Sequence, residues 1–191
     1  MHMSFSSHLT SSSDITYQST HQGTDENPKK RQIIFEKELL ERISFSMLNK
    51  ICENKERKDY KRIVSVQSKQ FFTSKFIPKM SLGDYLNRIM TYTKIEQPTL
   101  VSALIYIDRF CSKNKIILTE YNTHRLLIAS VVVSIKYNED RKYNNEFYSL
   151  VAGTDKKQLN QLEREFIYGI DFNLFIDEGE FETYERSLLF D

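Results

Sequence analysis

The residues that could carry out catalysis in this chain are few and scattered. A small acidic cluster lies at Glu139 and Asp140, with Glu146 six positions further on. Neighbouring carboxylates can act as general acid and general base. The sequence places no nucleophile, metal-ligand set or phosphate-binding loop beside them, so a solvated helix end is the favoured interpretation. We therefore expect no enzymatic activity.

Histidine and cysteine do not supply a metal site or a nucleophile–base pair. Three of the four histidines lie in the polar first 30 residues, and only His124 belongs to the apparent domain. Cys52 and Cys111 are 59 positions apart, and two thiols form neither a disulfide framework nor a multi-cysteine zinc cluster. We expect no metal, no cofactor and a reducing compartment.

The composition excludes further classes of function. No two of the five glycines lie within nine residues of each other, which excludes a dinucleotide-binding fingerprint and a P-loop. The 27 Lys+Arg and 26 Asp+Glu residues leave a net charge of +1, with no basic field for nucleic acid or a membrane surface.

No apolar run reaches the roughly 18 residues of a membrane span, and the first 20 residues lack signal-peptide features. We expect a cytoplasmic or nuclear protein, or one found in both. Lys29–Arg31 is either a weak nuclear signal or, as we favour, a charged run before a helix.

The pattern of apolar residues indicates a helical protein. Few glycines and prolines disfavour an all-β fold, and apolar residues recur at helical spacing along most of the chain. Residues 1–30 are rich in serine and threonine and should be disordered. Residues 31–77 should hold one helix at about 32–57 and a less regular connector that packs down at its aromatic residues. Further helices are expected after Ser81 and over about 98–112, 119–137, 144–151, 156–170 and 178–189.

Local signals mark several of these helix ends. Ser81 and Asp155 can cap helix N-termini, and Gly153 can end a helix in the left-handed conformation. Thr119 begins half of a capping box and should open the longest apolar helix. That helix is apolar nearly all round, which predicts a position at the centre of the fold. Its Val131–Val133 run also has strand propensity, but the flanking length and the lack of turn residues favour a helix.

Four short stretches, three in these helices or at their ends and one just after the helix at 156–170, match one known pattern. They are YIDRF at Tyr106–Phe110, SIKYNED at Ser134–Asp140, LEREF at Leu162–Phe166 and DFNL at Asp171–Leu174. In this order and at these separations they resemble the cyclin box, over residues 78–176. Further matches resemble the phosphate-type (P/U-type) cyclins in particular, and they lie at Pro78–Ile89, His124–Leu127, Tyr143–Tyr148, Leu159–Glu163 and Glu180–Tyr184.

The resemblance covers about residues 76–188 and implies an all-α fold. It places a single five-helix cyclin box at 78–176, an extra N-terminal helix within 31–77 and a short C-terminal helix within 177–191. It also places Asp108 and Arg109 at interior salt-bridge positions of the family.

Cyclins are regulatory subunits and not enzymes. The resemblance implies that this chain binds and activates a cyclin-dependent protein kinase and helps to select its substrates, in a setting such as the cell cycle or phosphate signalling. The resemblance places the polar kinase contacts of the family on Lys136 and Glu163. Their chemistry suits this role, since an ammonium group can satisfy kinase carbonyls and a carboxylate can accept hydrogen bonds from kinase N–H groups. From the residues alone, Lys136 is either a snorkelling or a docking side chain. The apolar contacts of the family fall on Tyr137, Phe166, Ile167, Phe172 and Leu174, and core packing is the alternative for each.

The same resemblance implies two further sites. Asp140 falls where this subfamily has an acidic residue that can reach an arginine near the kinase activation segment, and a plain loop acid is the alternative. A substrate-docking patch would comprise Met80, Leu82 and Tyr85, although Lys79 and Tyr85 replace the arginine and tryptophan of mitotic cyclins. The competing function is a cyclin-fold adaptor that binds a non-kinase protein.

Overall fold

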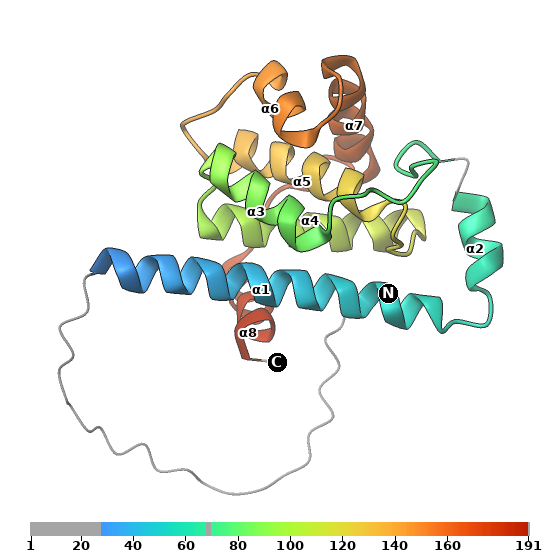
Figure 1. The fold of residues 1–191 in the computed structure, drawn as a ribbon, viewed down its shortest axis with the longest axis horizontal. Helices are drawn as coiled ribbons and strands as arrows, with labels where there is room; N and C mark the ends of the chain where they lie inside the picture. Colours follow the sequence, from blue (N-terminus) through green and yellow to red (C-terminus); the bar gives the residue numbers. More distant parts are fainter. Residues whose placement is uncertain (1–27, 68–69, 191) are drawn as a thin grey trace, which may run out of the picture.

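The computed structural model describes residues 28–67 and 70–190, and these residues form helices joined by loops, with no strand among them (Figure 1). The all-α fold class is therefore confirmed. Eight helices follow one another along the described residues: α1 (Pro28–Lys55), α2 (Tyr60–Gln67), α3 (Leu82–Thr93), α4 (Gln97–Asn114), α5 (Thr123–Asn138), α6 (Asn145–Ala152), α7 (Lys156–Gly169) and α8 (Glu178–Phe190).

Helix α5 forms the centre of the fold, as its composition predicts. It packs against α3, α4 and α7, while α6 packs against α3 and α7. Every residue from Leu126 to Ile135 is buried. The Ser130 and Ser134 hydroxyls donate to the carbonyls of Leu127 and Thr99, so their burial leaves no unsatisfied donor. The run at 131–133 is helical, which excludes the strand alternative.

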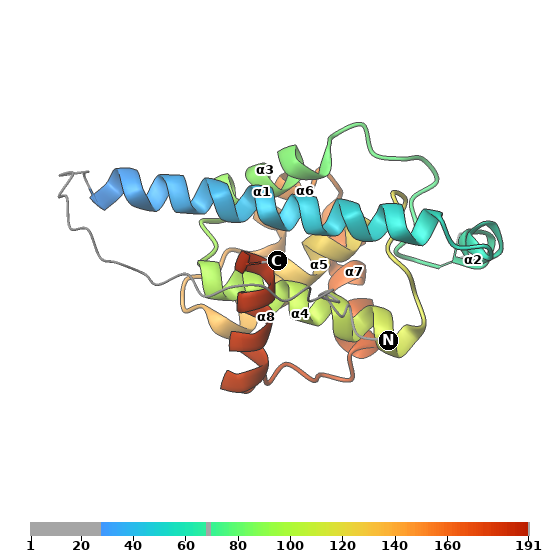
Figure 2. The same ribbon diagram turned by 90° about the horizontal axis from the view of Figure 1, so that it is seen from below.

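The long helix α1 lies across the outside of this bundle. It packs against α3 and against α8, and Figure 2 shows α8 running steeply away from the long axis of α1, next to α4. The apolar core continues from α3–α7 into α1 and α8. Helices α3–α7 fall within residues 78–176, the range expected for the five-helix box. The boundaries expected for the tail, the N-terminal helix with its connector, the box and the C-terminal helix stay predictions. Of the expected disordered tail, residues 1–27 lie outside the described residues, whereas 28–30 belong to α1.

Local capping signals place most helix ends correctly. Ser81 Oγ accepts a hydrogen bond from the Asp84 amide at 3.1 Å, and Asp155 Oδ1 accepts one from Gln158 at 2.8 Å. Gly153 ends α6 with a φ of 69°, in the left-handed region. These three predictions are confirmed. The half capping box expected at Thr119 is present, because the Thr119 amide donates to Asn122 Oδ1 at 2.8 Å. The helix α5 itself, however, begins at Thr123, four residues later than expected.

The connector before residue 78 is more ordered than expected, since it contains α2. Its packing at aromatic residues is confirmed for Phe72, which is buried with its ring 4.8 Å from Phe110 and 6.2 Å from Phe166. Phe76 in the same segment is exposed. Phe71 is partly buried against the same core, with its ring 6.0 Å from that of Phe72. The connector thus docks onto α4 and α7 through Phe72, supported by Phe71.

Candidate functional site

The two polar residues that the resemblance singled out lie in contact with each other. Lys136 is in the last turn of α5 and Glu163 is near the middle of α7, and the packing of these helices brings them together. Lys136 Nζ lies 2.5 Å from Glu163 Oε1. The side chains are 33% and 21% exposed, so both charges stand at the edge of the surface.

Three further polar residues complete this cluster. Asn145, the first residue of α6, donates through Nδ2 to Glu163 Oε2 at 2.6 Å and to Asn160 Oδ1 at 2.7 Å. Lys142 Nζ donates to the Lys136 carbonyl at 2.6 Å, which satisfies a carbonyl in the last turn of α5. Our sequence analysis missed all three. Asn160 lies one helical turn before Glu163, a spacing that could have identified it.

The apolar positions of the resemblance divide into surface and core. Tyr137 and Phe172 are exposed, while Ile167 and Leu174 are partly buried. Phe166, in contrast, is 0% exposed and stacks on Phe110 with ring centroids 5.0 Å apart. The ring of Phe166 therefore fills the space between α4 and α7, as the core-packing alternative expects, and its contact with a partner stays a prediction.

An unusual backbone turn displays Phe172. Asp171 and Phe172 both have positive φ, 51° and 56°, which is uncommon for residues other than glycine. The Phe172 ring packs edge-on against Tyr168 at 5.2 Å, and both rings are exposed. Aspartate is one of the residue types enriched at positive φ, so Asp171 is a weak sign of the turn, whereas Phe172 gives none. Tyr168 and Phe172 thus form an exposed aromatic pair at the C-terminal end of α7.

The segment after α7 is held down by two residues of the YIDRF stretch. The Tyr106 hydroxyl donates to the Leu174 carbonyl at 2.7 Å. Arg109 donates to the carbonyls of Asn173 and Phe175, at 2.8 and 2.9 Å, and pairs with Glu180 at 2.6 Å. The salt-bridge role implied for Arg109 is thus present in the structure.

The neighbouring Asp108 has a different environment from that of Arg109. It is buried, and its carboxyl shares a hydrogen bond with the Tyr184 hydroxyl of α8, while its Oδ1 atom finds no partner among the described residues. Burial raises the pKa of this carboxyl well above its ordinary value, and the Tyr184 hydrogen bond only partly opposes that effect. The described residues show no ion pair at Asp108, so its implied salt-bridge role is not seen.

The acidic cluster is not arranged for acid–base chemistry. Glu139 accepts a hydrogen bond from the Glu96 amide at 2.9 Å, and Glu146 lies 3.6 Å from Lys156. Asp140 is exposed on the loop after α5. The carboxylates thus serve separate structural partners, and no group of three metal-ligating side chains occurs among the described residues.

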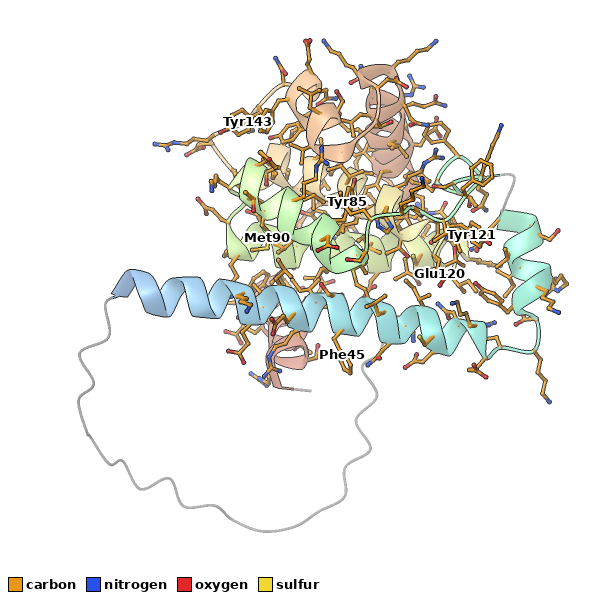
Figure 3. The ribbon with its side chains drawn as sticks, in the orientation of Figure 1. Phe45, Tyr85, Met90, Glu120, Tyr121 and Tyr143 are labelled. Atoms are coloured by element: carbon orange, nitrogen blue, oxygen red, sulfur yellow. The ribbon has the colours of Figure 1, made fainter. Side chains whose placement is uncertain are left out.

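The implied docking patch is mostly buried. Met80 is 37% exposed, but Leu82 and Tyr85 lie in the core. Of these three residues only Met80 presents its side chain at the surface, and the docking role stays a prediction. Tyr85, labelled in Figure 3, packs at 4.9 Å against the ring of His124. His124 Nε2 in turn bonds the Met80 carbonyl at 3.0 Å. Burial lowers the pKa of His124 and raises that of Tyr85, so both rings are neutral packing groups.

Comparisons with known proteins point to one family. The family model described as Cyclin matches residues 11–174. Cyclin-U2-2 of Arabidopsis thaliana is 41% identical over 128 residues, which cover 63% of this chain and 55% of that protein. Cyclin-U3-1 of the same plant is 34% identical over 146 residues, covering 76% and 65%. Cyclin-P3-1 of Oryza sativa subsp. japonica is 36% identical over 107 residues, covering 56% and 45%.

The matches cover only part of each relative. The chain spans about half the length of the curated relatives it matches. The described helices include none with the length and apolar character needed to cross a bilayer.

Proposed function

The chain belongs to the cyclin family and is of the P/U type, and from this premise we propose that it binds a cyclin-dependent protein kinase, activates it and helps to select its substrates. Such activation consists of holding the regulatory helix of the kinase in place, so that the Lys–Glu pair of the kinase itself can form. The chain supplies a rigid surface and takes no part in phosphoryl transfer.

The observation that carries this proposal is the contact between Lys136 and Glu163, together with the exposed ring of Tyr137, which directly follows Lys136 in sequence. An ammonium and a carboxylate at one edge can bind the carbonyl and N–H groups of a kinase segment. The rings of Tyr137 and Phe172 offer apolar area that a kinase helix could cover. Protein interfaces combine an apolar core, often aromatic, with a polar rim, and exposed rings and a charged pair can supply these two parts.

The Lys136–Glu163 contact does not oppose such binding. Both side chains are partly exposed, and ion pairs of this kind contribute only about 0–1 kcal/mol. Exchanging this contact for contacts with a kinase therefore costs little. The pair also keeps both groups near their binding positions before the partner arrives, which reduces the entropy lost on association.

Asp140 is proposed as a second contact. It is exposed on the loop that follows α5, four residues after Lys136. An exposed carboxylate there can pair with an arginine of the kinase activation segment, as a phosphate group would. Met80 is the exposed member of the docking patch and is its remaining candidate for contact with a substrate.

The test is reconstitution with purified cyclin-dependent kinases, taken one at a time, with binding and peptide phosphorylation measured together. We expect at least one kinase to bind and gain activity. The double variant Lys136→Ala with Glu163→Ala should weaken binding by about tenfold or more.

A matched control removes another tertiary ion pair of the chain. Lys55 and Glu120 lie 2.6 Å apart, with side chains of similar exposure, at the far end of α1. Replacing both by alanine changes the charge equally and should leave kinase binding within about twofold. If no kinase binds, the activating function is refuted and the adaptor for a non-kinase protein becomes the better explanation. Equal losses in both double variants would refute the site.

A further inference from the structure

Asn145 connects three elements at the polar cluster. It begins α6, directly after the loop marked by Tyr143 in Figure 3, and its amide nitrogen bonds two residues of α7. One of them is Glu163, whose other carboxylate oxygen binds Lys136 of α5. The carboxylate of Glu163 is therefore held from both sides, by an ammonium and by an amide.

The orientation of the Asn145 amide follows from its neighbours. The Glu163 carboxylate can only accept hydrogen bonds, so the Asn145 nitrogen must face it. As a consequence, Asn145 Oδ1 is buried and has no hydrogen-bond partner among the described residues. An unpaired buried acceptor costs free energy. The chain bears that cost while keeping both N–H groups of Asn145 engaged.

We propose that Asn145 is a positioning residue of the kinase-binding site, which acts by holding the Glu163 carboxylate in its binding orientation. This inference rests on the proposed function. When Lys136 turns towards kinase carbonyls, Glu163 loses its ion-pair partner, and the hydrogen bond from Asn145 then keeps the carboxylate in place. A group oriented in advance loses less conformational freedom when it binds.

The adjacent Asn144 provides a matched control. Asn144 caps α6, since its Oδ1 accepts a hydrogen bond from the Phe147 amide at 3.0 Å. Asn144→Ala removes an asparagine side chain from the same helix end and leaves the contact between Asn145 and Glu163 untouched. It reports what local loosening of α6 does to kinase binding.

The experiment is a double-mutant cycle, read as dissociation constants for a kinase recovered in the reconstitution. Asn145→Ala should weaken binding about tenfold in the wild-type background. In the Glu163→Ala background the same substitution should change binding less than about twofold, because the residue acts through Glu163. Asn144→Ala should lower the melting temperature and leave the dissociation constant within about twofold.

A measurement on the free protein tests the same contact without any kinase. The side-chain amide signals of Asn145 in a ¹⁵N correlation spectrum should shift strongly on Glu163→Ala and little on Lys55→Ala. Absence of that shift would overturn the inference even if no kinase binds, which separates its failure from that of the proposed function. Equal effects of Asn145→Ala in both backgrounds, or binding unchanged by Asn145→Ala, would overturn it as well.

Discussion

Gly169, at the end of α7, lies against the ring of Phe110 of α4 so closely that a side chain at this position would overlap the ring. Phe110 in turn stacks on Phe166 and touches Phe72, so one glycine lets α4 and α7 meet at an aromatic cluster. The turn that displays Phe172 begins directly after this glycine. Close packing in the core and the shape of the proposed binding surface are therefore linked.

The first prediction concerns Gly169→Ala. The added methyl group must displace the Phe110 ring or the end of α7, and overpacking of this kind costs about 1–3 kcal/mol of the free energy of unfolding. Chemical denaturation measures it. Gly83→Ala in α3 is the control, because its nearest neighbour lies at an ordinary 3.6 Å and alanine favours a helix. Similar destabilisation by both changes would contradict the explanation.

The second prediction separates Phe166 from Phe172. Phe166→Ala should lower the free energy of unfolding by about 3–5 kcal/mol, since the ring is fully buried. Phe172→Ala should change stability by less than about 1 kcal/mol and weaken kinase binding instead, because its ring is 57% exposed. Denaturation curves and dissociation constants of both variants decide the matter. A large stability loss for Phe172→Ala would show that its ring is structural.

The third prediction concerns Arg109, which links α4 to the segment before α8. Arg109→Ala leaves two carbonyls and Glu180 without their donor and should cost about 2–3 kcal/mol. Hydrogen exchange should increase selectively in residues 173–190. Glu180→Gln keeps an acceptor for Arg109 and should have the smaller effect. Uniform loss of protection across all helices would contradict this local role.

The fourth prediction concerns pH and His124. Burial holds the pKa of His124 below the ordinary 6.5, so below that pH the unfolded chain binds a proton that the folded chain does not. Stability should consequently fall as the pH drops through about 6.5 towards the lowered pKa, and be unaffected above it. His124→Gln should remove this part of the pH dependence in melting experiments from pH 8 to 5. If the melting temperature of His124→Gln depends on pH as that of the wild type does, groups other than His124 cause the dependence.

The fifth prediction concerns Asp140. Asp140→Arg reverses the charge proposed to face an arginine of the kinase activation segment, and it should reduce kinase activation by about tenfold. Because Asp140 is exposed, its replacement should leave the melting temperature unchanged. Kinase assays with equal amounts of complex measure it. Full activation by the variant would make Asp140 a plain loop acid.

Much of the secondary structure could be predicted because its causes are local. Apolar spacing, the caps at Ser81 and Asp155 and the glycine at Gly153 act within a few residues, and the structure confirms them. Helix α2 was missed because it has only 8 residues, follows a charge-rich stretch, and carries the β-branched residues Ile63, Val64 and Val66, which do not favour a helix. Its place depends on the burial of Gln67 against the rest of the chain, which no local signal reveals.

By itself, the sequence determined the all-α class, the buried centre at α5, the cyclin relationship and the candidate pair Lys136 and Glu163. Only the tertiary structure decided that these two side chains meet and that Asn145 holds one of them. It alone also showed that Phe166 faces the core while Phe172 faces solvent. The reason is physical. Periodicity and capping arise from neighbours along the chain, whereas these contacts join residues on different helices, and helix packing and one left-handed turn set their geometry.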